Sequence, residues 1–176
     1  MSSEAGASSS ARHRAREVAL QTLFAMDLHH RPKRPSNASV SAGMSDEDFL
    51  DAPQPIVPVH GDQTVEEVFE QVAKHFEMPH AAQAFAKDLV VQVIANSEAI
   101  DQLISSHAKN WRISRMAVVD RNILRLAAFE LVYTKTPAAV VLDEAVELAR
   151  RFGSDESPPF VNGVLDAVAR EVRVDG

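Results

Sequence analysis

The chain has 176 residues and no cysteine, so it is long enough for one domain with a hydrophobic core and has neither disulfide bonds nor thiolate chemistry. Its formal net charge is −7, yet the first 35 residues hold six Lys and Arg against three Asp and Glu. It has neither an N-terminal signal peptide nor an apolar run of about 18 residues, so we expect a soluble, cytoplasmic protein. A basic end on an acidic chain is typical of proteins that bind polyanions, although many basic tails are simply solvated.

The spacing of apolar residues is helical along almost the whole chain and shows no convincing strand pair, which predicts an all-α fold. We predict a disordered tail over residues 1–10 and a single domain over residues 11–176. Within that domain, residues 30–63 hold five of the nine prolines and many serines, so we predict a long disordered loop after the first helix. About seven helices are predicted, over residues 11–29, 64–77, 81–95, 97–109, 118–134, 138–152 and 158–173.

The first predicted helix opens with a cluster of cationic side chains, Arg12, His13, Arg14 and Arg16. This cluster is either a solvated helix start or a site for an anion. Two apolar stripes follow on opposite sides of the helix. The first consists of Ala15, Val18, Ala19, Thr22 and Met26, and the second of Leu20, Phe24 and Leu28. The second stripe either packs into the core or forms a docking face for another protein, and the pattern leaves both open.

Several helix boundaries can be predicted from capping residues. Thr64 followed three positions later by Glu67 fits a capping box. Gly153 follows the helix over 138–152 as a C-terminal cap would, because glycine enters the left-handed region without steric cost. Ser157 with Pro158 is typical of an N-cap and a first helical turn.

The two helices in the second half of the chain differ in their patterns. The helix over 118–134 is apolar nearly all round, apart from a narrow polar strip near Arg121 and Arg125, and is therefore predicted to be the buried centre of the fold. The helix over 138–152 is amphipathic, and its carboxylates are better explained by a solvated face than by acid–base chemistry. On that face, Glu147 and Arg151 have the favourable i,i+4 order of an ion pair. Its apolar side consists of Val141, Ala145, Leu148 and Phe152.

The sequence lacks the motifs of the common enzyme classes. It has no glycine-rich phosphate loop, no nucleophile elbow and no HExxH zinc helix. Glu77 and His80 have the spacing used in di-iron bundles, but Pro79 lies between them and no second such motif exists. We therefore expect a binding protein without catalytic residues, cofactor or metal.

The chain resembles the bacterial transcription antitermination factor NusB. The motif FVNGVLD, after an acidic Ser-Pro turn, carries much of this resemblance. The match runs in order and extends loosely over all but the tail and the loop. It implies two helical subdomains packed side by side. It also implies binding to the boxA element of ribosomal RNA leader transcripts together with NusE, a small-subunit ribosomal protein, in an RNA polymerase complex that supports processive transcription. The matching segments are 11–24, 111–131, 142–153 and 157–169.

The resemblance also implies site residues. The arginine-rich helix start would lie against RNA, because guanidinium groups bind phosphates bidentately and stack on bases. An aromatic side chain at the start of the last helix could stack on a base, or it could belong to the core. For RNA, the implied residues are Arg12, His13, Arg14, Arg16, Glu156, Ser157 and Phe160. For NusE, they are Leu20, Phe24 and Asp120.

Two other functions remain open from the sequence. One is an RNA-binding module related to that of ribosomal RNA methyltransferases, which resembles NusB but continues into a methylase domain. The other is a helical regulatory protein that forms homodimers through the stripe of Leu20, Phe24 and Leu28. RNA binding that neutralises phosphates should weaken steeply with salt, whereas association through an apolar face should not.

Overall fold

The structure is a computed structural model that describes residues 2–29 and 62–173. Within these ranges it contains seven α-helices, one short 3-10 turn and no strand, which confirms the all-α prediction. The predicted loop over 30–63 lies almost wholly outside the described residues. The elements are α1 (Ser2–His29), α3 (Val65–Ala73), α4 (His80–Ala95), α5 (Ser97–His107), η1 (Ile113–Arg115), α6 (Val118–Tyr133), α7 (Ala138–Phe152) and α8 (Ser157–Val172).

Helix α1 begins nine residues earlier than predicted. It starts at Ser2, so residues 2–10, which were predicted to be a disordered tail, are helical. These residues contain no proline to interrupt a helix. Once a helix exists, each added residue gains one hydrogen bond, so extension is much easier than starting a new helix. The prediction did not include this propagation from the packed part of the helix.

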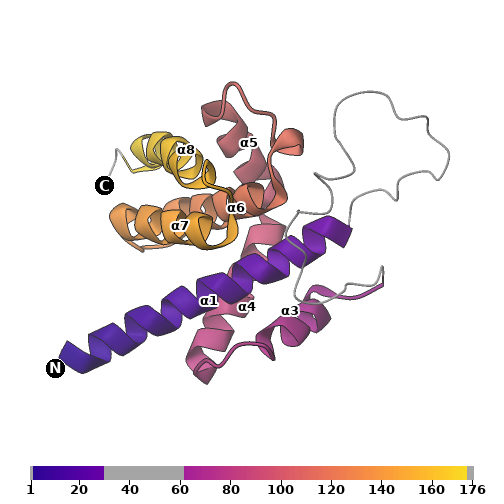
Figure 1. The fold of residues 1–176 in the computed structure, drawn as a ribbon, viewed down its shortest axis with the longest axis vertical. Coiled ribbons are helices and arrows are strands. Elements are labelled where there is room, and N and C mark those ends of the chain that lie inside the picture. The colour runs from indigo at the N-terminus through magenta and orange to yellow at the C-terminus, as the bar shows by residue number, and fades with distance from the viewer. Residues whose placement is uncertain (1, 30–61, 174–176) are drawn as a thin grey trace.

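Helix α1 lies between the two halves of the molecule. It contacts α3 and α4 on one side and α6 on the other, and α5, α7 and α8 pack around α6 (Figure 1). Both sides of α1 are therefore covered by the chain itself, and the described members of the two apolar stripes pack into the core or against it. Leu20 is 1% exposed and Phe24 is 4% exposed, and both belong to the continuous hydrophobic core.

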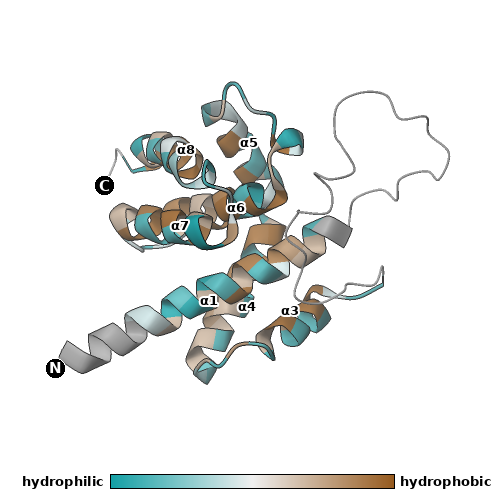
Figure 2. Cartoon of the chain, viewed as in Figure 1, coloured by the Kyte–Doolittle hydropathy of each residue, from teal (hydrophilic) through white to brown (hydrophobic). Residues whose placement is uncertain are grey.

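Helix α6 is the centre of the fold, as its nearly all-apolar sequence predicts. It contacts α1, α4, α5, α7 and α8. Figure 2 shows apolar segments, coloured brown, on α4, α6 and α7, and the buried residues of these helices belong to the hydrophobic core. Its polar strip faces neighbouring helices: Arg121 donates to Asp27 of α1 at 2.7 Å, and Arg125 donates to Asp101 of α5 at 2.7 Å. These ion pairs join α6 to the end of α1 and to α5.

The ends of three helices show how the sequence sets their boundaries. The capping box at α3 is confirmed, because Thr64 N donates to Glu67 at 2.8 Å and Glu67 N donates to Thr64 at 3.3 Å. Gly153 caps α7 in an extended conformation with φ −95°, so the left-handed explanation is wrong. A Cβ atom at Gly153 would lie 2.5 Å from the Ser157 hydroxyl, so glycine is needed for close packing. Glu156, rather than Ser157, is the N-cap of α8.

The C-terminal end of α6 is capped from the end of α8. The guanidinium of Arg173 donates to the carbonyl oxygens of Leu131 at 2.8 Å, Thr134 at 3.0 Å and Thr136 at 3.1 Å. The last carbonyls of a helix have no partner within the helix, and here one side chain supplies four hydrogen bonds in that region, the fourth to the carbonyl oxygen of Glu130 at 3.3 Å.

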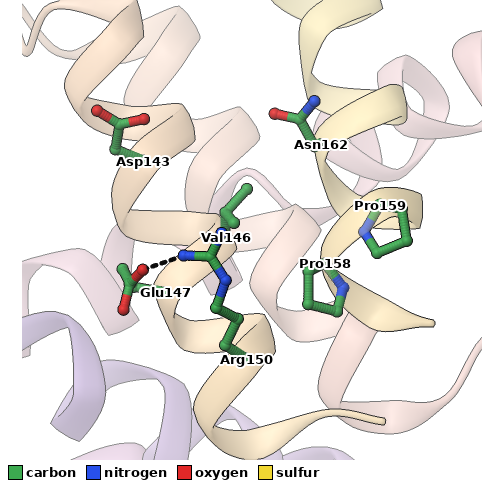
Figure 3. Close-up of a pocket in the computed structure, with 7 residues that line it drawn as sticks. All are labelled: Asp143, Val146, Glu147, Arg150, Pro158, Pro159 and Asn162. Carbon is green, nitrogen blue, oxygen red and sulfur yellow. Dashed lines mark hydrogen bonds and ion pairs between the residues drawn. The ribbon is translucent and has the colours of Figure 1, made fainter. Parts of the chain in front are cut away.

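Helices α7 and α8 leave a groove of about 700 Å³ between them (Figure 3). Asp143 and Glu147 line one wall, with Arg150 bonded to Glu147, and Pro158 and Asn162 line the other. The groove thus holds two carboxylates and one guanidinium, which disfavours an anion there. Among the helices that the structure describes, none is long and apolar enough to cross a membrane.

Candidate nucleic-acid interface

The basic cluster at the start of α1 divides into exposed and buried members, because successive helical residues point in different directions. Arg12 is exposed and forms no ion pair within the described part of the chain. Arg14 is 45% exposed and donates to Glu17 at 3.3 Å. These two guanidinium groups are accessible to an external anion.

Arg16 is a structural residue in this arrangement. Its side chain is 4% exposed, and it donates from Nε at 2.9 Å and from Nη2 at 3.0 Å to the two carboxylate oxygens of Glu130, which is also buried. It also lies over the ring of Phe85 at 5.6 Å. This burial argues against the implied role of Arg16 in RNA binding, because its Nε and Nη2 donors bond to α6 and its Nη1 atom lies 3.8 Å from Glu144 of α7.

His13 connects α1 to α7. Its Nδ1 lies 2.7 Å from Glu144 of α7, and its Nε2 lies 3.2 Å from Glu17 one turn along α1. The ring is 34% exposed, so one edge remains accessible. Both nitrogens face carboxylates, and His13 is thus less available to a phosphate than Arg12 or Arg14.

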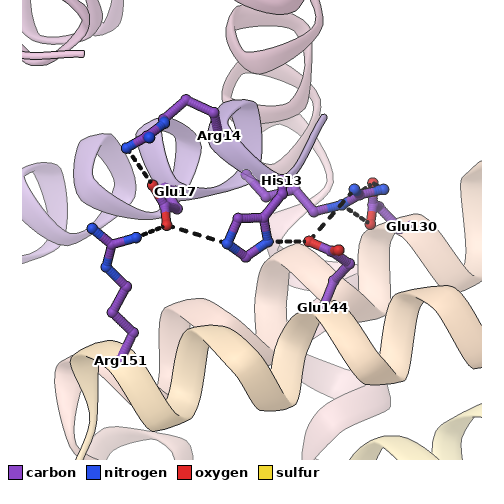
Figure 4. Close-up of polar contacts among 7 residues, drawn as sticks. His13, Arg14, Glu17, Glu130, Glu144 and Arg151 are labelled. Atoms are coloured by element: carbon purple, nitrogen blue, oxygen red, sulfur yellow. Dashed lines mark hydrogen bonds and ion pairs between the residues drawn. The ribbon is translucent and has the colours of Figure 1, made fainter. Parts of the chain in front are cut away.

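Glu17 is the centre of a polar cluster between α1 and α7 (Figure 4). Its carboxylate is fully buried, and His13, Arg14 and Arg151 all point toward it. Sequence reasoning missed Arg151 and instead predicted its pairing with Glu147, which bonds to Arg150 in the structure. Glu17 could have indicated such a partner, because it lies beside the stripe of small apolar residues of α1. A carboxylate that is buried there needs a cation nearby.

The start of α8 contributes a second group of candidate residues. Ser157 is 1% exposed, and its hydroxyl accepts a hydrogen bond from Ser154 N at 3.0 Å. It closes the turn between α7 and α8, so its implied contact with RNA is corrected. Glu156 is exposed beside it. Phe160 is half-buried and packs edge-on against Trp111, with ring centroids 5.7 Å apart.

Trp111 is a candidate that the sequence analysis did not assign. Its side chain is 60% exposed, and it lies on the segment between α5 and α6 beside the exposed Arg112. An exposed indole supported by a second ring, next to a guanidinium, offers a surface on which an unpaired base can stack. The sequence signal was the single tryptophan of the chain, but no pattern indicated its exposure.

The implied partner residues lie deeper than a docking surface would place them. Leu20 and Phe24 are in the core, as the core alternative predicts, which corrects their assignment to a NusE-facing stripe. The side chain of Leu28 lies outside the described residues. A chain-end helix can be covered on both sides here because α3 and α4 pack against it from the half opposite α6.

Asp120 is 9% exposed and lies in the first turn of α6, where the helix dipole favours a carboxylate. Its Oδ1 atom is buried and accepts no hydrogen bond from the described residues. Burial raises the pKa of Asp120, and a hydrogen bond with the Ser157 side chain offsets only part of this effect. Asp120 is therefore a buried carboxylate with no counter-charge among the residues that the structure describes. No group of three metal-ligating side chains occurs within residues 2–29 and 62–173.

Comparison with known protein families shows which family the chain belongs to. Residues 13–170 match the model of the NusB family. The chain belongs to the NusB family. This match includes Arg14, Trp111, Arg151 and Phe160, whereas Arg12 lies one residue before it.

Relatives of the NusB family agree in length and fold. The chain is 39% identical to the transcription antitermination protein NusB of Geotalea daltonii over 161 residues, which cover 91% of this chain and 94% of that protein. The structure of T. maritima NusB superimposes with a TM-score of 0.68 at 29% identity, covering 91% of each chain. A crystal structure of the antitermination factors NusB and NusE in complex with double-stranded RNA matches with a TM-score of 0.66 at 26% identity, covering 92% of this chain and 97% of that one.

Proposed function

We propose that this chain is a transcription antitermination factor that binds RNA together with NusE. The observation that carries the proposal is its NusB-family sequence and fold, combined with the solved complex of a structural neighbour with NusE and RNA. The proposed RNA is the boxA element of ribosomal RNA leader transcripts, and the proposed complex includes transcribing RNA polymerase. The protein would act there without catalysing a reaction, in the cytoplasm where bacterial transcription takes place.

The exposed side chains of the site support this function. Arg12 and Arg14 offer guanidinium groups for phosphates, and Trp111 and Phe160 offer aromatic faces and edges for bases. Single-stranded RNA is recognised by this combination of cations and stacking, because its bases are not hidden in a duplex.

The first test measures the affinity for a boxA-type RNA, with and without NusE, over a series of salt concentrations. We expect the variant Arg12→Ala plus Arg14→Ala to bind more weakly, with a salt slope smaller by roughly one unit for each lost phosphate contact. Arg170→Ala is the matched control, because Arg170 is a 79% exposed arginine near the far end of α8. Equal affinity of both variants and the wild type would remove the start of α1 from the RNA interface.

The second test uses Trp111 as an intrinsic probe, because it is the only tryptophan of the chain. Stacking of a base on the indole should quench its fluorescence when boxA-type RNA is added, and Phe160→Ala should reduce the quenching by removing the supporting ring. A fluorescence spectrum that does not change at saturating RNA would exclude Trp111 from base contact.

A further inference from the structure

We infer that Arg151 of α7 is a further RNA-binding residue that contacts a phosphate beside Arg14 of α1. This inference rests on the RNA-binding function proposed above. It adds α7 to the proposed interface, and it assigns a binding role to a residue on a helix whose charged face the sequence analysis explained as solvated.

The geometry brings the two arginines together on one carboxylate. Arg14 donates to the Oε2 atom of Glu17 at 3.3 Å, and Arg151 donates to the Oε1 atom of the same side chain. The two oxygens of a carboxylate are close together, so the two guanidinium groups are held on either side of the Glu17 carboxylate at the junction of α1 and α7 (Figure 4). The side chains of Arg14 and Arg151, 137 positions apart in the sequence, thus belong to one cationic surface.

Most of the hydrogen-bonding capacity of both arginines remains free for a ligand. A guanidinium has five N–H donors, and only one nitrogen of each side chain bonds to Glu17. Arg14 is 45% exposed and Arg151 is 54% exposed, whereas Glu17 is fully buried beneath them. Glu17 therefore orients the two cations from below and leaves their outer donors facing solvent.

The exposed charges of the cluster suit an anion. Arg14 and Arg151 are about half exposed, whereas the carboxylate of Glu17, to which both bond, is buried. The neighbouring Glu144 lies 2.7 Å from His13 and 3.8 Å from the buried Arg16, which itself pairs with Glu130. A phosphate that bridges Arg14 and Arg151 would contact these two exposed cations, and bidentate contacts suit guanidinium groups.

Arg150 provides a matched control in the adjacent position. It is 62% exposed and also bonds to a glutamate, but that glutamate is Glu147 and the pair lines the α7–α8 groove (Figure 3). The two arginines thus share residue type, helix, exposure and pairing, and they differ in the surface that they face. A non-specific effect of charge would be the same for both.

The experiment compares Arg151→Ala, Arg150→Ala and Arg12→Ala with the wild type, using a boxA-type RNA oligonucleotide and a series of KCl concentrations. We expect Arg151→Ala to weaken binding about tenfold, the range of one hydrogen bond between charged groups, and to reduce the salt slope by about one unit. Arg150→Ala should change neither quantity. Arg151→Lys should keep the salt slope and bind with intermediate affinity, because an ammonium retains the charge but loses the planar fork.

The outcomes separate this inference from the proposed function. If Arg12→Ala weakens binding while Arg151→Ala matches Arg150→Ala, RNA binding stands and the role of Arg151 is wrong. If Arg151→Ala lowers only the thermal midpoint and leaves the affinity and salt slope unchanged, Arg151 is a structural partner of Glu17 and the inference also fails. A wild-type chain that does not bind the RNA, alone or with NusE, would overturn both.

Discussion

Helix α1 meets α6 and α7 through two ion-pair clusters that use the same residue types in different surroundings. In the contact with α6, both Arg16 and Glu130 are buried, and the guanidinium and carboxylate face each other at 2.9 Å and 3.0 Å. In the contact with α7, only the acid, Glu17, is buried, and the cations Arg14 and Arg151 are about half exposed. A buried cation can only stabilise the fold, whereas an exposed cation can also bind a ligand.

The largest expected effect comes from breaking the buried pair. Arg16→Ala should lower the free energy of unfolding by about 3–5 kcal/mol, because Glu130 would remain buried in α6 without its hydrogen-bonding cation. Chemical denaturation of the purified variant measures this loss directly.

A double variant sharpens the interpretation of this loss. Arg16→Met combined with Glu130→Leu removes both charges and retains apolar volume, so it should recover most of the lost stability. If it is as unstable as Arg16→Ala, the cause is lost packing around these positions and not an uncompensated charge.

A loss of stability of similar size is expected when a buried apolar side chain of α1 is truncated. Phe24→Ala should lower the free energy of unfolding by about 3–5 kcal/mol through lost burial and a residual cavity. Affinity for NusE, measured well below the melting temperature of the variant, should stay close to that of the wild type. Near-normal stability with a large loss of NusE affinity would instead show that Phe24 is a docking residue.

A much smaller effect is expected on the exposed side of the comparison. Arg14→Ala should lower the free energy of unfolding by less than about 1 kcal/mol, because the pair with Glu17 is partly solvated and two other cations still face that carboxylate. Parallel denaturation of Arg14→Ala and Arg16→Ala tests the comparison most directly. Equal losses for the two variants would contradict it.

The smallest effect concerns Asp120, a buried carboxylate with no cation. Burial raises its pKa in the folded state, so ionisation costs stability. This cost is absent below the pKa of the unfolded chain and complete above the pKa of the folded chain. Asp120→Asn should therefore raise the melting temperature at neutral pH, by at most about 2–4 °C, and the gain should vanish below about pH 4.

Thermal melts at several pH values measure this effect, with Asp143→Asn on the exposed side of α7 as the control. A gain that is the same at acidic and neutral pH would show that it does not come from ionisation of Asp120. Asp120 also tests the partner surface. Unchanged affinity of Asp120→Asn for NusE would remove this residue from the predicted interface.

The sequence was sufficient for the fold because its helices have local signals. The box of Thr64 and Glu67 fixes the start of α3, and the apolar character of residues 118–134 predicts the central helix. The start of α1 at Ser2 could not be predicted in the same way, since it depends on propagation from a helix that is packed in the interior. Local signals thus place most boundaries, and tertiary packing decides the rest.

The site could be predicted only in part, because residue type does not reveal exposure. Arg12, Arg14 and Arg16 look alike in the sequence, and the partner of Arg16 lies 114 positions away. One signal was available in Glu130, because a carboxylate within an otherwise apolar helix needs a cation in the core. The exposure of Trp111 had no comparable signal.

The cap that Arg173 places on α6 has a consequence for how the chain folds during synthesis. The carbonyl of Leu131 receives its hydrogen bond from a residue that is translated 42 positions later. Until that residue has left the ribosome and α8 has docked, the carbonyl oxygens at the end of the central helix lack these donors and must bond to water. The cap on α6 therefore cannot form before nearly the whole chain has been translated. We expect a chain truncated before Arg173 to lose protection from hydrogen exchange first at the C-terminal end of α6.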